Sequence, residues 1–265
     1  SQNPCEILPE YVEAWARMGV KYLLCRSIGY DHIPLETAKK LGMRVAHSHY
    51  PPEGVANYAI MLMLMCTRKM NQTMLRAAAQ DYTLPGKMGR DLSNCTVGVI
   101  GTGKIGRTVI AHLQGFGCKI LAYDLYQSDE VAPMAEYVPL DELYARSDVI
   151  TLHTNATAEN HHLINAESLA KMKDGVLIVN TARGALVDEE AVADALQSGQ
   201  LAYYGADAFG TEPLPQDSRL RSLPNAILTP HIAWTTKEAL QRLMDITTRN
   251  LRTWLEGSGE HIVNG

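Results

Sequence analysis

Three side chains of this sequence have the types that acid–base chemistry on a small acid needs. Arg183 offers a planar pair of N–H donors that suits a carboxylate and also a keto oxygen. His231 can donate a proton to such an oxygen and take it back. Glu212 beside the imidazole would favour its charged form and fix its orientation. We expect the other histidines to be structural or solvent-facing; among them, His153 and His49 are the reserve candidates for a functional role.

Each of the three also has an ordinary alternative reading. Arg183 could be a surface arginine at the start of a loop, and Glu212 before Pro213 a solvated carboxylate in a turn. His231 after Pro230 could simply cap a strand. The case for a site rests on position, because each residue follows a predicted strand and the carboxyl ends of parallel strands meet at one edge of a sheet.

The elements that must position these residues alternate between short apolar runs and helical patterns. From residue 97 onward the predicted strands are 97–100, 119–123, 148–152, 176–180, 203–208 and 226–229. Six such runs with helices between them indicate the doubly wound parallel sheet of the Rossmann fold. Ligands bind such sheets beyond the carboxyl ends of the strands, where the three candidate residues fall.

The stretch 96–124 carries the strongest signal for a ligand. Its strand is followed by Gly101, Gly103 and Gly106 in G-x-G-x-x-G spacing, and then by a helical pattern of apolar residues. The first glycine permits the tight turn, the second lets a pyrophosphate approach the backbone, and the third allows close helix packing. The free N–H groups at the helix start favour an anion. Strand, glycines and helix in one window indicate a dinucleotide site.

Asp124 ends the next predicted strand, near the roughly 20-residue offset at which a carboxylate accepts from the adenosine ribose. A carboxylate there repels a 2′-phosphate, and Leu125 and Tyr126 follow it rather than an arginine. The sequence therefore favours NAD over NADP. Beside a nicotinamide, the arginine, glutamate and histidine suit hydride transfer to a 2-keto acid.

Loops at the same edge supply the remaining candidates. Asp207 could accept from the nicotinamide carboxamide or orient a neighbour, and Thr154, Thr181 and Ala182 follow strands directly. The residues expected to bind the cofactor are Gly101, Gly103, Lys104, Ile105, Gly106, Asp124, Thr154, Thr181, Ala182 and Asp207. No metal site is expected.

The pattern divides the chain into three parts. We expect a partial substrate domain at 1–50, with strands at 20–25 and 44–48, and an NAD-binding Rossmann domain at 51–234. The latter begins with a long helix at about 53–70 and a polar linker at 81–94. We expect residues 235–265 to form a C-terminal helix that returns to the substrate domain. Thr235 and Glu238 resemble a capping box at its start.

Composition excludes several classes of protein. The 265 residues are 46% hydrophobic with a net charge of −5, and no basic patch suggests nucleic acid. No apolar run is long enough to cross a bilayer, and no signal peptide is visible. Five cysteines without a C-x-x-C pair argue against disulfides and zinc and for a reducing compartment, so we expect a cytoplasmic protein.

The residues 20–256 resemble the D-isomer-specific 2-hydroxyacid dehydrogenases. The stretches that carry the resemblance are VGVIGTGKIG, GFGCKILAYD, LINAESLAKMKDGVLIVNTARGALVD, GADAFGTEPLP and ILTPHIAW. The resemblance assigns the roles given above to Arg183, Glu212 and His231. It also implies NAD, a homodimer and a smaller, flavodoxin-like α/β domain that closes over the cofactor. RSIGYDHI and PPEGVANYAIMLMLM are most similar to the D-lactate dehydrogenase branch, including the VanH-type enzymes of vancomycin resistance.

Two departures from the family pattern stand out. The chain opens near the last two strands of the small domain, so about half of that domain and one wall of the substrate pocket are expected to be missing. The usual H-x-P-L-T is also altered, to His153-Thr154-Asn155-Ala156-Thr157. Loss of the proline should loosen a loop on the cofactor side without removing a catalytic group.

The sequence favours reversible reduction of pyruvate, or of a slightly larger 2-keto acid, to the D-hydroxy acid. A hydroxypyruvate or glyoxylate reductase is the nearest rival, since ILTPHIAW and TEPLP also resemble that branch. An NADH-sensing protein like the C-terminal-binding corepressors, or an inactive remnant that only dimerises, are the alternatives outside catalysis. The methionine-rich helix at 53–70, with Met61 and Met65, is the expected dimer contact.

Overall fold

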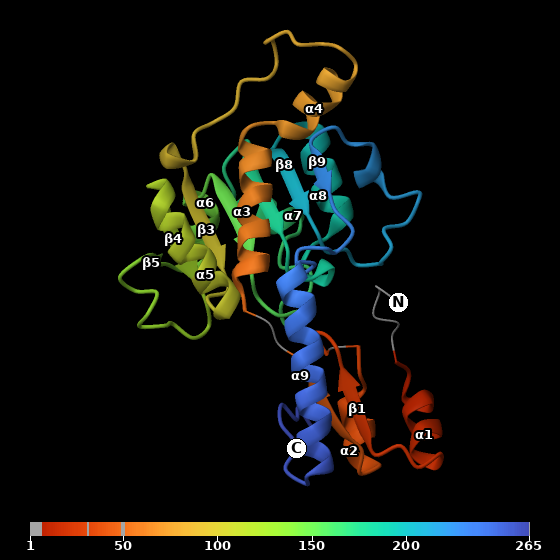
Figure 1. Cartoon of the computed structure of the whole chain (residues 1–265). Coiled ribbons are helices and arrows are strands. Elements are labelled where there is room, and N and C mark those ends of the chain that lie inside the picture. The colour runs from red at the N-terminus through yellow and green to blue at the C-terminus, as the bar shows by residue number, and fades with distance from the viewer. Residues whose placement is uncertain (1–6, 31, 49–50, 265) are drawn as a thin grey trace. The chain divides into compact units, whose positions relative to one another are not determined.

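The computed structural model describes residues 7–30, 32–48 and 51–264, and these fall into two compact units (Figure 1). The large unit takes in residues 52–234, and the small unit combines residues 1–51 with 235–265. The reserve histidine His49 and the cysteine Cys5 lie outside the described residues. Among the described residues, no helix combines the length and apolar character that a membrane span requires.

The large unit is built on one parallel sheet with the strand order β5-β4-β3-β6-β7-β8-β9. Its strands are β3 (Thr96–Ile100), β4 (Lys119–Tyr123), β5 (Glu136–Tyr137), β6 (Val149–Leu152), β7 (Val176–Asn180), β8 (Leu201–Ala206) and β9 (Ala226–Leu228). The predicted doubly wound Rossmann sheet is confirmed, but the count of six strands from residue 97 onward is wrong. The seventh, β5, has two residues, too few to show a hydrophobic pattern.

Helices cover both faces of this sheet, which explains why its strands are apolar throughout. In β7, Leu177 and Val179 belong to the core that includes residues of α3 (Glu53–Thr67) and α5 (Lys104–Leu113), and β7 packs against α3. Val176 and Ile178 face the opposite core. That second core is formed with α6 (Leu140–Arg146), α7 (Ala166–Ala170) and α8 (Glu189–Ser198). The strands are thereby fixed from both sides, and the loops at their carboxyl ends are held in place.

The predicted long helix at 53–70 ends early, at Thr67. Lys69 adopts a left-handed conformation with φ of 52°, and a separate helix, α4 (Met70–Ala78), follows it. Sequence analysis missed α4, in which no residue is fully buried. A short 3₁₀ turn, η1 (Leu92–Asn94), then ends the predicted linker.

The small unit contains a second parallel sheet of two strands, β1 (Tyr22–Cys25) and β2 (Arg44–His47), joined by α2 (Leu35–Lys40). Helix α1 (Pro9–Arg17) precedes them, and α9 (Lys237–Leu255) packs on β1. The side chain of Thr236 accepts from Ala239 N and so begins α9, one residue later than the expected capping residue Thr235.

Candidate active site

The glycine motif forms a tight turn between β3 and α5. Gly101 has φ of 92°, and a Cβ there would lie 2.6 Å from the carbonyl carbon of His153. A Cβ on Gly106 would overlap the Gly101 carbonyl oxygen, so only glycine lets α5 start this close to the loop. A Cβ on Gly103 would meet nothing within 4 Å. The loop is therefore packed on its inner side and open at Gly103.

The open side of the loop suits a pyrophosphate. Lys104, Ile105 and Gly106 form the first turn of α5, whose backbone N–H groups have no partner within the helix. Asp124, at the end of β4, lies against the same loop, because its Oδ2 accepts from Thr102 N at 2.6 Å and from Thr102 Oγ1 at 3.1 Å. The structure thus brings the expected phosphate and ribose contacts together.

A buried, unsatisfied hydroxyl marks the loop after β7. Thr181 is 9% exposed, and its Oγ1 has no hydrogen-bond partner in the described part of the chain. Such an atom is costly unless a ligand or water satisfies it, so it fits a polar group of a bound dinucleotide. Thr154, after β6, is partly exposed and its hydroxyl donates to Asn155 O at 3.4 Å.

The reserve histidine, His153, supports the glycine loop. Its Nε2 lies 2.9 Å from Thr151 Oγ1. Burial lowers the pKa of its imidazole to about 3. The side chain is therefore neutral near pH 7, which suits a packing role beside Gly106 better than a proton donor.

Arg183 lies on a loop that one buried side chain holds. Asn180 is fully buried at the end of β7; its Oδ1 accepts from Ala182 N at 3.0 Å and its Nδ2 donates to Arg183 O at 2.9 Å. Next to the arginine, a Cβ on Gly184 would overlap the backbone of Phe209, so the loops after β7 and β8 touch. Sequence reasoning missed both residues, although a buried polar residue ending an apolar strand was a readable signal.

Glu212 and His231 form a hydrogen-bonded pair across the loops after β8 and β9. His231 Nδ1 lies 2.8 Å from Glu212 Oε2 and 3.0 Å from Oε1. Although burial acts to raise the pKa of Glu212, hydrogen bonds from His231 and Phe209 N and the charges of His231 and Arg183 bring it below the usual value. The carboxylate is therefore ionised near pH 7, and Nδ1–H of His231 donates to it.

The backbone of His231 is left-handed, with φ of 55°, an uncommon conformation for a residue with a side chain. Asp207, which is 1% exposed, stabilises this turn: its Oδ1 accepts from Thr229 Oγ1 at 2.7 Å and Ile232 N at 2.9 Å, and its Oδ2 from Ala233 N at 2.8 Å. Burial raises the pKa of Asp207 despite these bonds. Of its two predicted roles, orienting a neighbour is the one that these contacts support.

The three candidate catalytic residues therefore converge at one sheet edge, next to a glycine loop that fits a dinucleotide. In the described residues, no three histidine, cysteine or carboxylate side chains gather closely enough to hold a metal ion. A Rossmann sheet that carries a paired histidine and glutamate, an arginine and a dinucleotide-type glycine loop at one edge is typical of a nicotinamide-dependent dehydrogenase.

Comparison with known proteins identifies the family. Residues 60–233 match the model of the D-isomer specific 2-hydroxyacid dehydrogenase NAD-binding domain. The chain is 42% identical over 255 residues to a 2-hydroxyacid dehydrogenase homolog of Haemophilus influenzae, covering 91% of this chain and 77% of that protein. It is 37% identical to the D-lactate dehydrogenase of Escherichia coli, covering 93% of this chain and 79% of that protein.

A solved structure agrees. The D-lactate dehydrogenase of Aquifex aeolicus, complexed with NAD and lactic acid, superposes with a TM-score of 0.90 at 34% identity, over 98% of this chain and 84% of that one. The chain belongs to the D-isomer-specific 2-hydroxyacid dehydrogenases. It is an NAD-dependent oxidoreductase, as the glycine loop, Asp124 and the resemblance together predicted.

Proposed function

We propose that this enzyme reduces pyruvate, or a slightly larger 2-keto acid, to the D-hydroxy acid, with Arg183, Glu212 and His231 as the catalytic residues. The observation that carries the proposal is the pair formed by His231 Nδ1 and Glu212 Oε2 at 2.8 Å. This hydrogen bond places the proton on Nδ1 and leaves Nε2 as the ring nitrogen that exchanges a proton with substrate.

The chemistry divides among these side chains. Bound NADH supplies the hydride that reduces the keto carbon. Arg183 binds the substrate carboxylate through its guanidinium and orients the keto group. His231, charged and held by Glu212, donates its Nε2 proton to the keto oxygen, which becomes the hydroxyl. In the reverse direction the neutral imidazole takes that proton back.

The cofactor contacts and the division of labour between the units belong to the same proposal. Gly101, Gly103, Lys104, Ile105 and Gly106 hold the pyrophosphate, and the ribose is bound by Asp124. Thr154, Thr181 and Ala182 line the nicotinamide side, while Asp207 acts there by fixing the His231 turn. The large unit thus binds the cofactor, and the small unit contributes to the substrate side.

The test is NADH oxidation with a panel of 2-keto acids, which includes pyruvate, hydroxypyruvate, glyoxylate and larger apolar acids. We expect pyruvate or a slightly larger acid to give the highest kcat/KM. Hydroxypyruvate or glyoxylate at the top of the order would identify a reductase of that class instead. An Arg183→Lys variant should lose about 100-fold in kcat/KM because a single ammonium cannot form the paired bonds. Full activity in that variant would contradict the role of Arg183.

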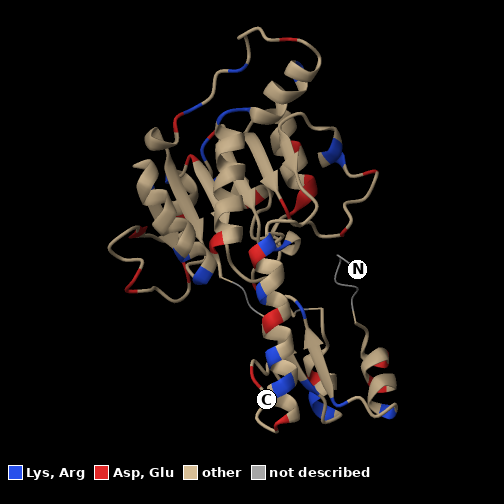
Figure 2. Cartoon of the chain, viewed as in Figure 1, with Lys and Arg blue, Asp and Glu red and all other residues tan. Residues whose placement is uncertain are grey.

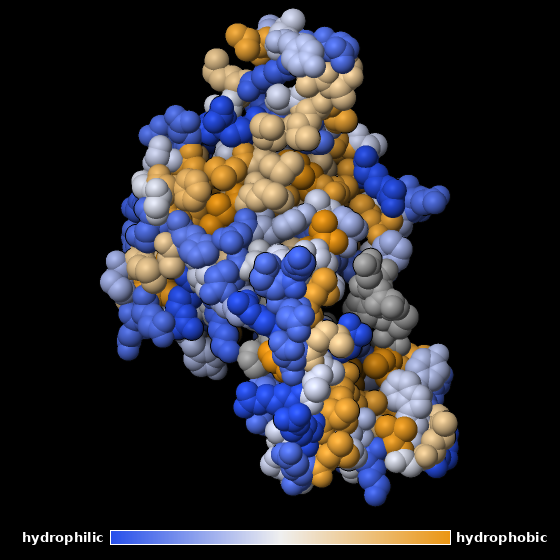
Figure 3. Space-filling model, in the orientation of Figure 1, coloured by the Kyte–Doolittle hydropathy of each residue, from blue (hydrophilic) through white to orange (hydrophobic). Residues whose placement is uncertain are grey.

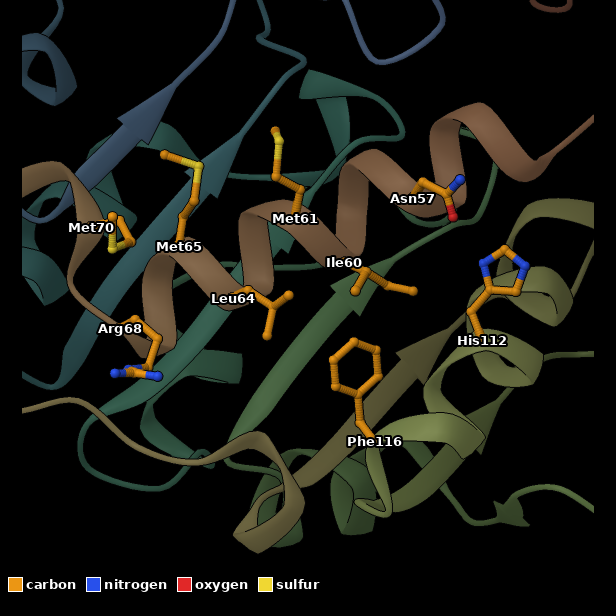
Figure 4. Close-up of a pocket in the computed structure, with 9 residues that line it drawn as sticks. All are labelled: Asn57, Ile60, Met61, Leu64, Met65, Arg68, Met70, His112 and Phe116. Carbon is orange, nitrogen blue, oxygen red and sulfur yellow. The ribbon is translucent and has the colours of Figure 1, made fainter. Parts of the chain in front are cut away.

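We further propose that α3 forms a homodimer contact. Beyond Glu53, α3 carries no charged residue (Figure 2), and the surface over α3 and α4 is largely apolar (Figure 3). Met61 is 39% exposed there, and Met65 is partly exposed. An apolar hollow of about 640 Å³ lies beside α3. In Figure 4, Ile60 and Leu64 of α3 point toward Phe116. A second copy of the chain would cover this surface.

Cytoplasmic localisation stays a prediction.

A further inference from the structure

A directed chain of hydrogen bonds ends on the carboxylate of Asp124. The backbone N–H of Ser128 donates to Tyr137 Oη at 3.0 Å, and the Tyr137 hydroxyl donates to Thr102 Oγ1 at 2.9 Å. The Thr102 hydroxyl in turn donates to Asp124 Oδ2 at 3.1 Å. Every donor in this sequence points the same way, and hydrogen bonds in such a chain strengthen one another.

The bonds to Asp124 leave a specific acceptor position. Its Oδ2 accepts twice, from the N–H and the hydroxyl of Thr102, and its Oδ1 accepts from Tyr126 N at 3.1 Å. A carboxylate has about four acceptor sites, two on each oxygen. In the part of the chain that the structure describes, these contacts fill Oδ2 and leave one site on Oδ1. The rotation of the carboxylate about its bond decides where that site points.

Tyr137 is well placed to fix this rotation. It lies on β5, where it pairs with Ala122 of β4, and its ring packs against the core beneath α3 and α5. Thr102, which it contacts, is 5% exposed, and the bond from Tyr137 orients its hydroxyl toward Asp124. Arg107 also pins the loop after β4, through an ion pair with Glu130 at 2.7 Å.

We propose that Tyr137 is a positioning residue for the cofactor. Through the Thr102 hydroxyl it holds the Asp124 carboxylate so that Oδ1 accepts from the ribose of NADH, and it thereby sets the preference for NADH over NADPH. This inference rests on the assignment of Asp124 to the ribose in the proposed function. Removing the Tyr137 hydroxyl takes away the donor to Thr102 Oγ1 and so weakens the bond that the Thr102 hydroxyl makes to Asp124. The backbone N–H groups of Thr102 and Tyr126 still hold the carboxylate, so NADH binding weakens moderately and the chemical step is untouched.

The experiment compares Tyr137→Phe, Thr102→Val and Thr102→Ser with the wild type. Dissociation constants for NADH and NADPH are measured by the fluorescence of the reduced nicotinamide, and kcat and both KM values by turnover. The matched control is Tyr144→Phe, since Tyr144 is buried in the same unit and its hydroxyl donates to Leu163 O at 3.3 Å, outside this chain of bonds.

We expect Tyr137→Phe to raise the dissociation constant and KM for NADH about three- to tenfold, and to lower the NADH/NADPH preference by the same factor. The kcat value and the KM for the keto acid should stay unchanged. Thr102→Val should weaken NADH binding to a similar extent, and Thr102→Ser should have little effect because it keeps the hydroxyl. The double variant Tyr137→Phe/Thr102→Val should bind NADH no more weakly than Thr102→Val alone, since both changes break the same chain of bonds. Tyr144→Phe should keep wild-type affinities.

Two results would overturn the inference. Equal weakening of NADH and NADPH binding in Tyr137→Phe would show that the hydroxyl only supports the fold of this region and does not set the cofactor preference. Unchanged NADH affinity in Tyr137→Phe while Asp124→Asn weakens it about tenfold or more would leave the proposed function standing and exclude the positioning role. Unchanged affinity in Asp124→Asn itself would instead refute the ribose assignment on which the inference rests.

Discussion

At the scale of single residues, the hydrogen bond between His231 and Glu212 predicts the effect of one substitution on catalysis. In Glu212→Gln an amide replaces the carboxylate, so the imidazole that donates the proton loses its charged partner. We expect the kcat of keto-acid reduction to fall about tenfold or more, while the dissociation constant for NADH stays unchanged. Steady-state turnover and NADH fluorescence measure the two quantities. A wild-type kcat in this variant would contradict the role of Glu212.

His153 makes a prediction about stability in acid. Its pKa is about 3 in the folded protein against 6.5 unperturbed, so below pH 6.5 the unfolded chain binds a proton that the folded chain does not. His153→Gln removes this difference. As the pH is lowered from 6.5 to 3, the free energy of unfolding of the wild type should therefore fall relative to that of the variant, by up to about 1.4 kcal/mol per pH unit. Urea unfolding at pH 7, 5.5 and 4.5 measures it, and parallel curves would contradict the burial of a neutral ring.

Residue type and strand position together were enough to predict that Arg183, Glu212 and His231 lie at one sheet edge, because parallel strands carry their loops there. The sequence did not reveal how they are held. The side chains of Asn180 and Asp207 hold these loops by hydrogen bonds to backbone groups. Such contacts depend on the geometry of the loops, which produces no periodic pattern in the sequence. The orphaned hydroxyl of Thr181 and the left-handed turn at His231 are likewise visible only once the chain is folded.

At the scale of elements, alanine substitution of two loop glycines should affect different properties: the stability of the fold at Gly184 and the binding of NADH at Gly103. A methyl group on Gly184 would overlap the Phe209 backbone, so Gly184→Ala should cost about 3 kcal/mol or more of unfolding free energy. Gly103 has open space and a negative φ, so Gly103→Ala should fold normally. Its methyl group would project toward the pyrophosphate and weaken NADH binding about tenfold. Denaturant unfolding and NADH fluorescence separate the two effects, and similar losses of stability in both would contradict this packing.

Long elements with a buried face were predictable, and short or exposed ones were not. The four-residue and longer strands of the large sheet read as apolar runs because both faces are covered. Strand β5 has two residues, too few to show a pattern, and no residue of α4 is fully buried. The break at Lys69 depends on a left-handed backbone that lysine rarely adopts, which no local pattern indicates.

At the scale of the whole molecule, the apolar surface of α3 predicts self-association. Met61→Asp and Met65→Asp place a carboxylate where the proposed partner would bury it, at a cost that association cannot recover. We expect these variants to sediment as monomers where the wild type sediments as a dimer. Met18→Asp is the control, because Met18 is 79% exposed on the small unit. A dimer that survives both α3 variants would place the contact elsewhere.

The small unit is assembled from two stretches of chain that lie far apart in sequence. Tyr22 stacks on Trp254 with ring centroids 4.7 Å apart, and its hydroxyl donates to the Asn250 carbonyl across 228 positions. The large unit is one continuous segment between those stretches. On a ribosome, the Rossmann sheet can therefore close while α9 is still being made, since domains fold as units during synthesis. Strands β1 and β2 are made before the large unit, and α9, which packs on β1, is made only after it.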